Sequence, residues 1–139
     1  MEMIVENVQG ETPVTILSLQ GDLDASNFET AIAKVQGLYA SGTRRLLLDL
    51  SGLKFMSSSG LVALHSIILL MRGEQPHDLE TGWNVLHAID QNHERKPLPQ
   101  VKVLNPQPKI ASTLQKTGMD HFFDIFTDRQ AALASFQNG

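Results

Sequence analysis

Residues 53–64 read LKFMSSSGLVAL, and this stretch decides the fold because three serines and a glycine join a strand-like run to a long apolar run. Apolar residues fill nearly every position from Leu61 to Met71, which is typical of a helix packed on more than one side. Ser57, Ser58 and Ser59 therefore stand where that helix begins. A serine in this place can be a nucleophile, a phosphate acceptor or a helix cap, and each role needs different surroundings.

The residues before this stretch predict a hairpin, a helix and a buried strand. Segments 4–8 and 14–19 are rich in β-forming residues on either side of a Gly/Pro turn. Ser26–Glu29 has the spacing of a capping box, and apolar residues at helical spacing follow it as far as Gly42. Residues 44–50 are then almost continuously apolar, as in a strand buried on both faces. Strand, helix and strand in this order imply a parallel crossover and a mixed sheet.

The C-terminal part predicts more elements of the same kind. Val101–Leu104 reads as a strand, and Asn105-Pro106 as the start of a helix that ends at Gly118. Phe122–Phe126 reads as a last short strand, and Thr127–Gln130 as a second capping box that opens a terminal helix. We therefore expect an α/β fold, with a mixed sheet of about four to five strands packed with about four helices.

Residues 73–100 interrupt this regular pattern. The segment is polar, contains three prolines and is longer than most connections within a small domain. Trp83 and nearby leucines recur in it at roughly helical spacing, so part of it is predicted to be an amphipathic helix. We favour a helix that covers its own domain, and keep Trp83 as a contact for a partner or a second copy as the alternative. The chain is expected to be a single domain, 1–139, with an insertion at about 73–100.

Composition excludes several classes of protein. The 139 residues are 42% hydrophobic, include no cysteine and carry a formal net charge of −4, so disulfides and cysteine metal sites are absent. The basic clusters are Arg44-Arg45 and the short Arg95-Lys96, which do not make the coherent basic face of a nucleic-acid binder, so nucleic acid is not expected as a partner. The N-terminus lacks the parts of a secretory signal, and the longest apolar run is shorter than the roughly 20 residues that span a bilayer. We expect a cytoplasmic protein without membrane insertion.

Catalytic and metal-binding motifs are not convincing. The stretch from Met56 to Gly60 lacks the first glycine of the Gly-x-Ser-x-Gly elbow of serine hydrolases. His87 and His93 are six residues apart, which places them on different faces of a helix rather than around one metal ion. A phosphate-binding loop of the Gly-x-x-x-x-Gly-Lys type is also missing. The sequence predicts no enzyme, no cofactor and no metal.

Two roles remain for the serines. Ser57 or Ser58 can cap the helix, because a serine oxygen accepts well from a backbone NH at a helix start. A phosphoserine there would also be stabilised by unpaired NH groups and the positive end of the helix dipole. Its added charge, about −1.5 to −2 at pH 7, would disturb a partner docked on that corner. One residue can be both a cap and a switch.

The sequence resembles the STAS domain family of anti-sigma factor antagonists in three places. Residues 50–61 resemble the family's central motif, whose usual core is Asp-Ser-Ser/Thr-Gly-Leu. Gly21–Asp24 resembles its Gly-Glu-Leu-Asp loop, and Leu114–Met119 with Phe123–Phe126 resembles its Leu-x-x-Thr-Gly-Leu segment and last strand. The resemblance covers nearly the whole chain apart from residues 73–100.

The resemblance implies a site. In that family a partner kinase, which is also an anti-sigma factor, phosphorylates the serine that follows the motif's aspartate. Carried onto this sequence, the phosphoacceptor is Ser58, and Asp24 lies beside it in the docking surface together with Ser57, Ser59 and Gly60. Ser57 replaces the motif's aspartate, so Ser57 and Ser59 stay alternative acceptors.

The function implied is that of a non-enzymatic partner-switching regulator. It would bind an anti-sigma-factor serine kinase or a related signalling protein, and phosphorylation at the start of the helix would release that partner. The alternative is a constitutive STAS scaffold in a transport or signalling assembly, in which the serines only cap a helix. A homodimer is left open.

Overall fold

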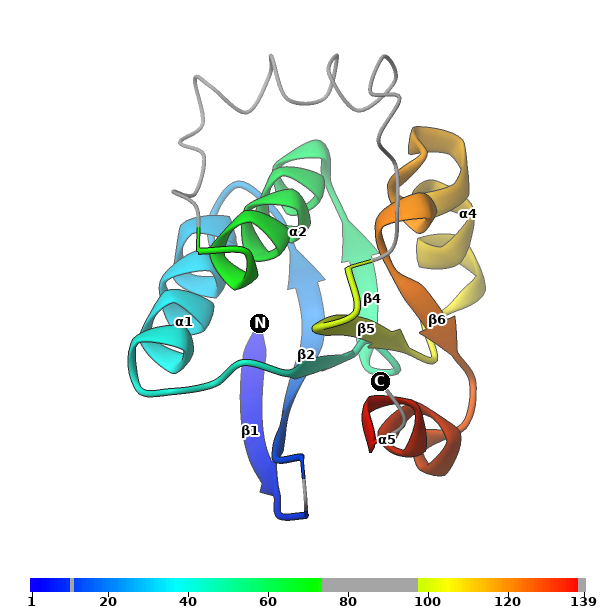
Figure 1. Ribbon diagram of the computed structural model, residues 1–139. Coiled ribbons are helices and arrows are strands. Elements are labelled where there is room, and N and C mark those ends of the chain that lie inside the picture. Colours follow the sequence, from blue (N-terminus) through cyan, green and yellow to red (C-terminus); the bar gives the residue numbers. More distant parts are fainter. Residues whose placement is uncertain (11, 74–97, 138–139) are drawn as a thin grey trace.

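The structure, a computed structural model, describes residues 1–10, 12–73 and 98–137 (Figure 1). Its six-stranded sheet has the order β1-β2-β3-β5-β6, and β4 pairs with β2 outside this path. The elements are β1 (Glu2–Val8), β2 (Val14–Leu23), α1 (Phe28–Ala40), β3 (Leu46–Asp49), β4 (Leu53–Met56), α2 (Ser58–Met71), β5 (Val101–Leu104), α4 (Pro108–Thr117), the 3-10 helix η1 (Met119–Phe122), β6 (Asp124–Phe126) and α5 (Arg129–Gln137). The predicted α/β class is confirmed. The sheet has six strands, one more than the four to five that the sequence predicted.

Strand β2 organises the sheet because it pairs with three other strands. The hairpin β1–β2 is antiparallel, as predicted, whereas every other described pair is parallel. Residues 15–18 of β2 pair with β3, and Gly21–Leu23 pair with β4 after a register shift between Gly21 and Asp22. The middle of β2 therefore pairs with β3 and its C-terminal end with β4, the strand that leads into α2.

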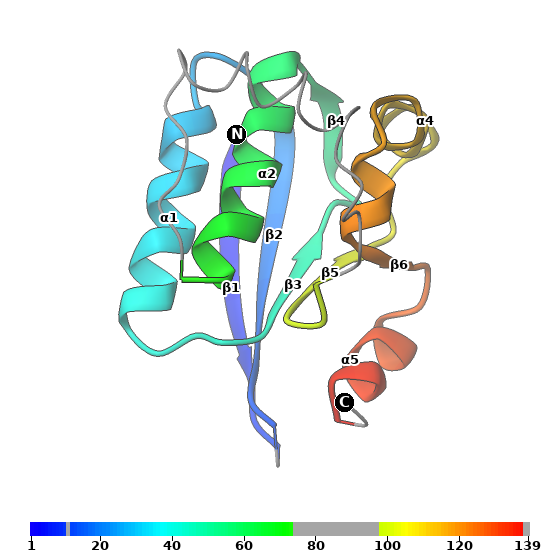
Figure 2. The ribbon, with the colours of Figure 1, turned by 45° about the horizontal axis from the view of Figure 1, so that its top comes forward.

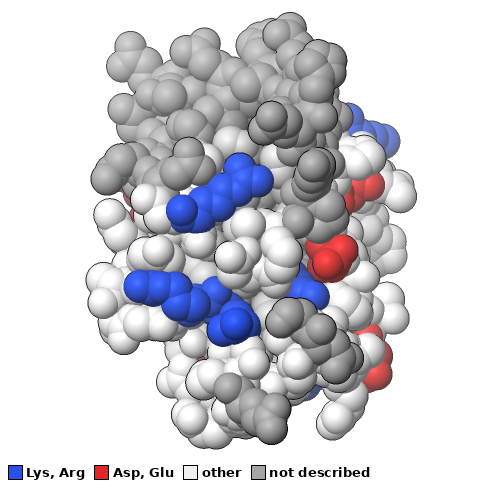
Figure 3. All heavy atoms as spheres, viewed as in Figure 1, with Lys and Arg blue, Asp and Glu red and all other residues white. Residues whose placement is uncertain are grey.

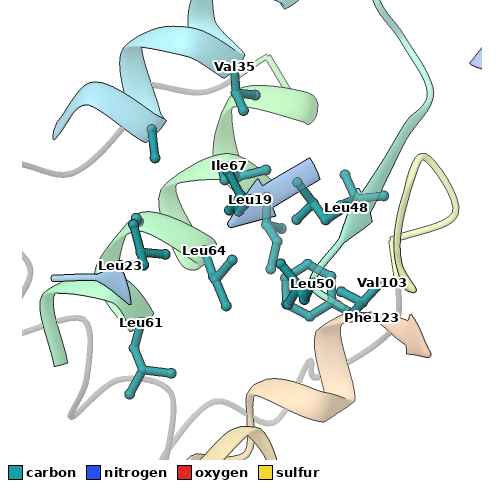
Figure 4. Packing of buried hydrophobic residues seen from close by; sticks show 14 of the residues in the cluster. Leu19, Leu23, Val35, Leu48, Leu50, Leu61, Leu64, Ile67, Val103 and Phe123 are labelled. Atoms are coloured by element: carbon teal, nitrogen blue, oxygen red, sulfur yellow. The ribbon is translucent and has the colours of Figure 1, made fainter. Parts of the chain in front are cut away.

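Alternate strand residues supply two separate cores. Leu46 and Leu48 of β3 belong to the larger core with residues of α1, α2 and α4, while Leu47 belongs to a smaller one beneath α5. All three leucines are fully buried, which is the two-sided burial predicted from the continuous apolar run. Figures 1 and 2 show α1 and α2 side by side against the sheet, with α5 at its far lower corner. Figure 4 shows Leu64 and Ile67 of α2 among the strand leucines of the larger core.

The capping box expected at Ser26–Glu29 is wrong. Helix α1 begins at Phe28, its N-cap residue is Asn27, and no side chain caps it. The Ser26 hydroxyl instead donates to Asp24 Oδ1 at 2.5 Å. The helix therefore starts one residue later than the capping box predicts. The helix end predicted near Gly42 is confirmed, since α1 ends at Ala40 and Gly42 has φ 118°.

Asn105-Pro106 does not start the next helix. Asn105 has φ 52°, and its NH donates to the carbonyl of Phe126 at 2.6 Å, so this residue ends the strand pairing instead. Helix α4 begins at a second proline, Pro108, and stops at Gly118 with φ 78°, the left-handed end that was predicted.

Two boundaries near the C-terminus also differ from the expectation. Phe122 lies in η1 rather than in the last strand, and β6 begins at Asp124. Helix α5 is capped by Asp128 rather than Thr127, because the carboxylate of Asp128 accepts the NH groups of Gln130 and Ala131 at 3.4 and 3.3 Å. The expected elements are present in both cases, with shifted boundaries.

No helix in the described ranges is long and apolar enough to cross a membrane. Most of the segment expected to be an insertion, including Trp83, lies outside the described residues.

Candidate functional site

The candidate site is the corner where β2 and β4 end side by side. Leu23 pairs with Met56, the last residues of the two strands, and the NH of Ser57 then donates to the Leu23 carbonyl at 3.0 Å. Asp24 and Ser57 therefore leave the sheet next to each other, one towards α1 and the other into α2. The structure thus brings together the two segments that the sequence had singled out.

Ser57 is the residue that caps α2. Its backbone is extended, with φ −85° and ψ 179°, and its Oγ accepts from the NH of Gly60 at 3.4 Å. The carbonyl of Ser57 accepts the first helical hydrogen bond, from the NH of Leu61 at 3.2 Å. The choice between Ser57 and Ser58 as the cap is therefore decided in favour of Ser57.

The other two serines face in different directions. Ser58, the first residue of α2, is exposed, whereas Ser59 is buried with 8% of its surface accessible. The helical rotation of about 100° per residue explains this, because neighbouring side chains on a helix cannot share a face. Ser58 is thus the serine of the three that is both exposed and free of the capping role.

Gly60 packs directly against the end of β2. A Cβ atom added to it would lie 2.5 Å from Met56 Cγ and 2.9 Å from the carbonyl oxygen of Leu23. Both distances are shorter than a real Cβ contact, and the second neighbour is backbone that cannot easily move. Gly60 is therefore required for α2 to approach the strand this closely, and it contributes no side chain to the surface.

Asp24 is held in a compact turn at the partly exposed edge of the corner. Its Oδ1 accepts the NH of Ser26 at 2.9 Å as well as the Ser26 hydroxyl, and its own NH donates to Asn27 Oδ1 at 2.9 Å. Asn27 Nδ2 also donates to the carbonyl of Asp22 at 2.8 Å. The side-chain and then the backbone hydrogen bond from Ser26 hold the pKa of Asp24 below the usual aspartate value.

Sequence reasoning missed Asn27 and Phe55. Asn27 holds the Asp22 carbonyl and the Asp24 NH, the backbone groups on either side of Leu23, a role that its position within an assumed capping box concealed. Phe55 of β4, three residues before Ser58, is 46% exposed. An exposed aromatic side chain beside a candidate docking corner is a typical interface anchor, but the strand pattern gave no signal of it.

The described part of the chain holds no group of three or more His, Asp or Glu side chains that could bind a metal ion. The helix that begins at Ser58 has no acidic residue in its first turn. The corner thus presents the exposed hydroxyl of Ser58 at the start of α2.

The sequence model of the STAS domain matches residues 6–75, which include both Asp24 and the three serines. The chain belongs to the STAS domain family. None of the curated proteins searched matches its sequence.

Solved structures agree on the fold. A candidate anti-sigma factor antagonist from Thermotoga maritima superposes with a TM-score of 0.68 at 15% identity, covering 96% of this chain and 94% of that one. The unphosphorylated anti-sigma factor antagonist SpoIIAA superposes with a TM-score of 0.63 at 19% identity. This match covers 99% of this chain and 98% of SpoIIAA. SpoIIAA in the phosphorylated form, described as a Bacillus cell fate determinant, superposes with a TM-score of 0.57 at 17% identity. This match covers 96% of this chain and 97% of that one. The chain thus has the fold of anti-sigma factor antagonists.

We predict that Gly60→Ala destabilises the protein by about 1–3 kcal/mol, because the added methyl group must displace Met56 and the Leu23 carbonyl. The matched control is Gly37→Ala in α1, where a Cβ would meet no atom within 4 Å. That change should stabilise by roughly 0.5–1 kcal/mol, because alanine is the better helix former. Urea unfolding of both variants measures the difference, and equal effects would contradict the close approach at Gly60.

We predict that Ser57→Ala costs about 1 kcal/mol of stability through the lost cap, while Ser58→Ala changes it by no more than about 0.5 kcal/mol. The reason is that Ser57 Oγ accepts the Gly60 NH whereas Ser58 is exposed. Thermal unfolding followed by circular dichroism distinguishes the two variants. A larger loss for Ser58→Ala than for Ser57→Ala would reverse the assignment of the cap.

We predict that Ser26→Ala raises the pKa of Asp24 towards its usual value, because the hydroxyl donor is the largest cause of the lowered pKa. With the folded pKa below the unfolded one, the ionised carboxylate stabilises the native protein above about pH 4, and this contribution is lost as the pH falls through the folded pKa. Carbon-detected NMR titration of the Asp24 carboxyl measures the change. Ser41→Ala, at the far end of α1, should leave that pKa unaltered.

Proposed function

We propose that this STAS protein is a non-enzymatic partner-switching regulator whose phosphoacceptor is Ser58. The unmodified corner, made of Asp24 and residues 57–60, would bind an anti-sigma-factor serine kinase or a related signalling protein in the cytoplasm. A phosphate on Ser58 would then release that partner. The observation that carries the proposal is that Ser58 is the exposed serine at the first position of α2, while Ser57 caps the helix and Ser59 is buried.

The helix start can accommodate a phosphate. Backbone NH groups in the first turn of a helix have no helical acceptor, and the dipole places positive charge there. No acidic residue of the first turn opposes the added charge. A phosphate on Ser58 would therefore find donors within its own chain, at little cost to the fold.

Ser57 in place of the family's aspartate fits the same account. Serine and aspartate are comparably good N-caps, so the change preserves the start of α2 while removing one negative charge next to Ser58. The local repulsion felt by a phosphate on Ser58 is reduced by this change. The kinase loses one charged feature that it could recognise, which is why Ser57 and Ser59 remain the alternative acceptors.

A partner would also meet an apolar group at this corner. Phe55 is 46% exposed on β4, and Lys54 beside it is exposed as well. An aromatic anchor next to a hydroxyl that can acquire charge is suited to switching, because a phosphate must be desolvated when a partner covers it. Binding and modification of the same corner would then exclude each other.

We further propose that residues 1–139 form one STAS domain with an insertion at about 73–100. The insertion begins just after the C-terminal end of α2, which is the end of the helix opposite to Ser58. The runner-up function is a constitutive STAS scaffold, favoured by the loss of the motif aspartate, in which residues 57–59 only shape the helix start.

Affinity capture from the native cell extract tests the switch. Wild type and Ser58→Ala should retain the same kinase-like partner, and Ser58→Asp should lose it, because the added charge imitates the modified state. Ser41→Asp is the matched control, since Ser41 is exposed at the far end of α1, and it should bind like wild type. Equal retention by all four proteins would reject the switch in favour of the scaffold.

A further inference from the structure

A second polar region lies at the N-terminal ends of the parallel strands, opposite to the corner that holds Ser57–Ser59. The α1–β3 connection, residues 41–45, lines a hollow of about 420 Å³ together with Asn7, Pro13 and Thr15. A second hollow of about 240 Å³ is lined by Arg45, Pro99, Gln100, Lys102, Ser135 and Phe136. Arg45 lines both, so the two hollows adjoin. Their combined volume is within the range of small-molecule sites.

The charge of these hollows is opposite to that of the whole chain. The protein has a formal net charge of −4, yet the residues that line the two hollows include Arg44, Arg45 and Lys102 and no aspartate or glutamate. Figure 3 shows Lys and Arg atoms gathered across this face, over the α1–β3 connection. Within the described residues the ion pairs closer than 4.0 Å are Lys102–Asp124, His121–Asp120 and Arg129–Glu6, so neither arginine faces a carboxylate at that distance.

Lys102 is the unusual member of the group. Only 7% of its surface is accessible, and its Nζ lies 3.8 Å from Asp124 Oδ2, which is beyond hydrogen-bonding distance. The rings of Phe136 and Phe126 lie 4.9 and 5.6 Å from Nζ. A buried ammonium normally makes hydrogen bonds with its three donors. This one retains donor capacity for a ligand in the smaller hollow.

The larger hollow is already shaped by fixed polar groups. The Arg44 guanidinium donates to the carbonyls of Tyr39 and Thr43 at 2.8 and 2.9 Å and lies 3.8 Å from the centre of the Tyr39 ring. Thr15 Oγ1 lies 3.1 Å from Thr43 Oγ1 and donates to Asn7 Oδ1 at 3.2 Å. Hydroxyl and amide groups held in this way can exchange hydrogen bonds with a polyhydroxylated ligand.

We propose that these adjoining hollows bind a small phosphomonoester that carries hydroxyl groups. The phosphate lies between Arg45 and Lys102, whose charge-assisted donors suit its oxygens. The hydroxylated part lies in the larger hollow against Thr15, Ser41 and Thr43. The proposal is independent of the corner made of Asp24 and residues 57–60, because that corner lies at the opposite ends of the parallel strands.

Titration with ribose 5-phosphate, followed by backbone amide NMR, tests this site. We expect saturable shifts at residues 43–46 and 101–102, with inorganic phosphate competing at a weaker affinity. Arg45→Gln should weaken binding at least tenfold, because a charged hydrogen-bond donor is removed. Arg72→Gln, an equal change of charge at the end of α2, should bind like wild type.

Lys102→Met provides the second test, because it keeps an unbranched side chain of similar size in the buried position and removes the ammonium group. It should also weaken ribose 5-phosphate at least tenfold while its amide spectrum stays that of a folded protein. Ribose without phosphate should cause no saturable shift. The proposal is overturned if ribose 5-phosphate gives no saturable shift up to millimolar concentration, or if Arg45→Gln binds as tightly as Arg72→Gln.

Discussion

The contact between Gly60 and the end of β2 is the constraint on which the candidate site depends. The first turn of α2 lies against the Leu23 carbonyl, which also accepts the NH of Ser57. Any side chain at position 60 would push the helix away from the strand. That displacement would separate the serines from the Asp24 turn, because both segments leave the sheet from the Leu23–Met56 pair. Close packing and site geometry thus share one cause.

The same contact gives each serine a different environment. With residue 60 turned towards β2, Ser59 is buried, Ser57 bonds back to the helix start, and Ser58 points to solvent. Three consecutive identical residues therefore differ in accessibility without any difference in intrinsic chemistry. A kinase that reaches this corner would find one hydroxyl both exposed and not needed for the cap.

Much of the fold was predictable from local patterns. The continuous apolar run of β3 predicted its two-sided burial, and the glycine at 118 predicted the end of α4. The capping boxes were less reliable, because Ser26 bonds to the Asp24 carboxylate and Asp128 takes the place of Thr127. A four-residue spacing cannot reveal which polar partner a serine will choose once tertiary neighbours are present.

The site was only partly predictable for a related reason. The sequence placed the serines at a helix start, but their burial depends on the direction in which α2 meets β2, which no local pattern encodes. The exposure of Phe55 likewise depends on β4 lying outside the main path of the sheet. Family resemblance suggested Ser58 as the acceptor that we propose, and the structure adds that Ser58 is the exposed serine that does not cap the helix.

The most direct measurement of the central claim is the modification state of the tryptic peptide Phe55–Arg72, from the protein isolated from its native cells. Fragmentation mass spectrometry separates the three serines of the corner within this peptide. The account predicts a fraction of the peptide with a single phosphate, located on Ser58. A peptide that is unmodified under all growth conditions, or that carries its phosphate on buried Ser59, would contradict it.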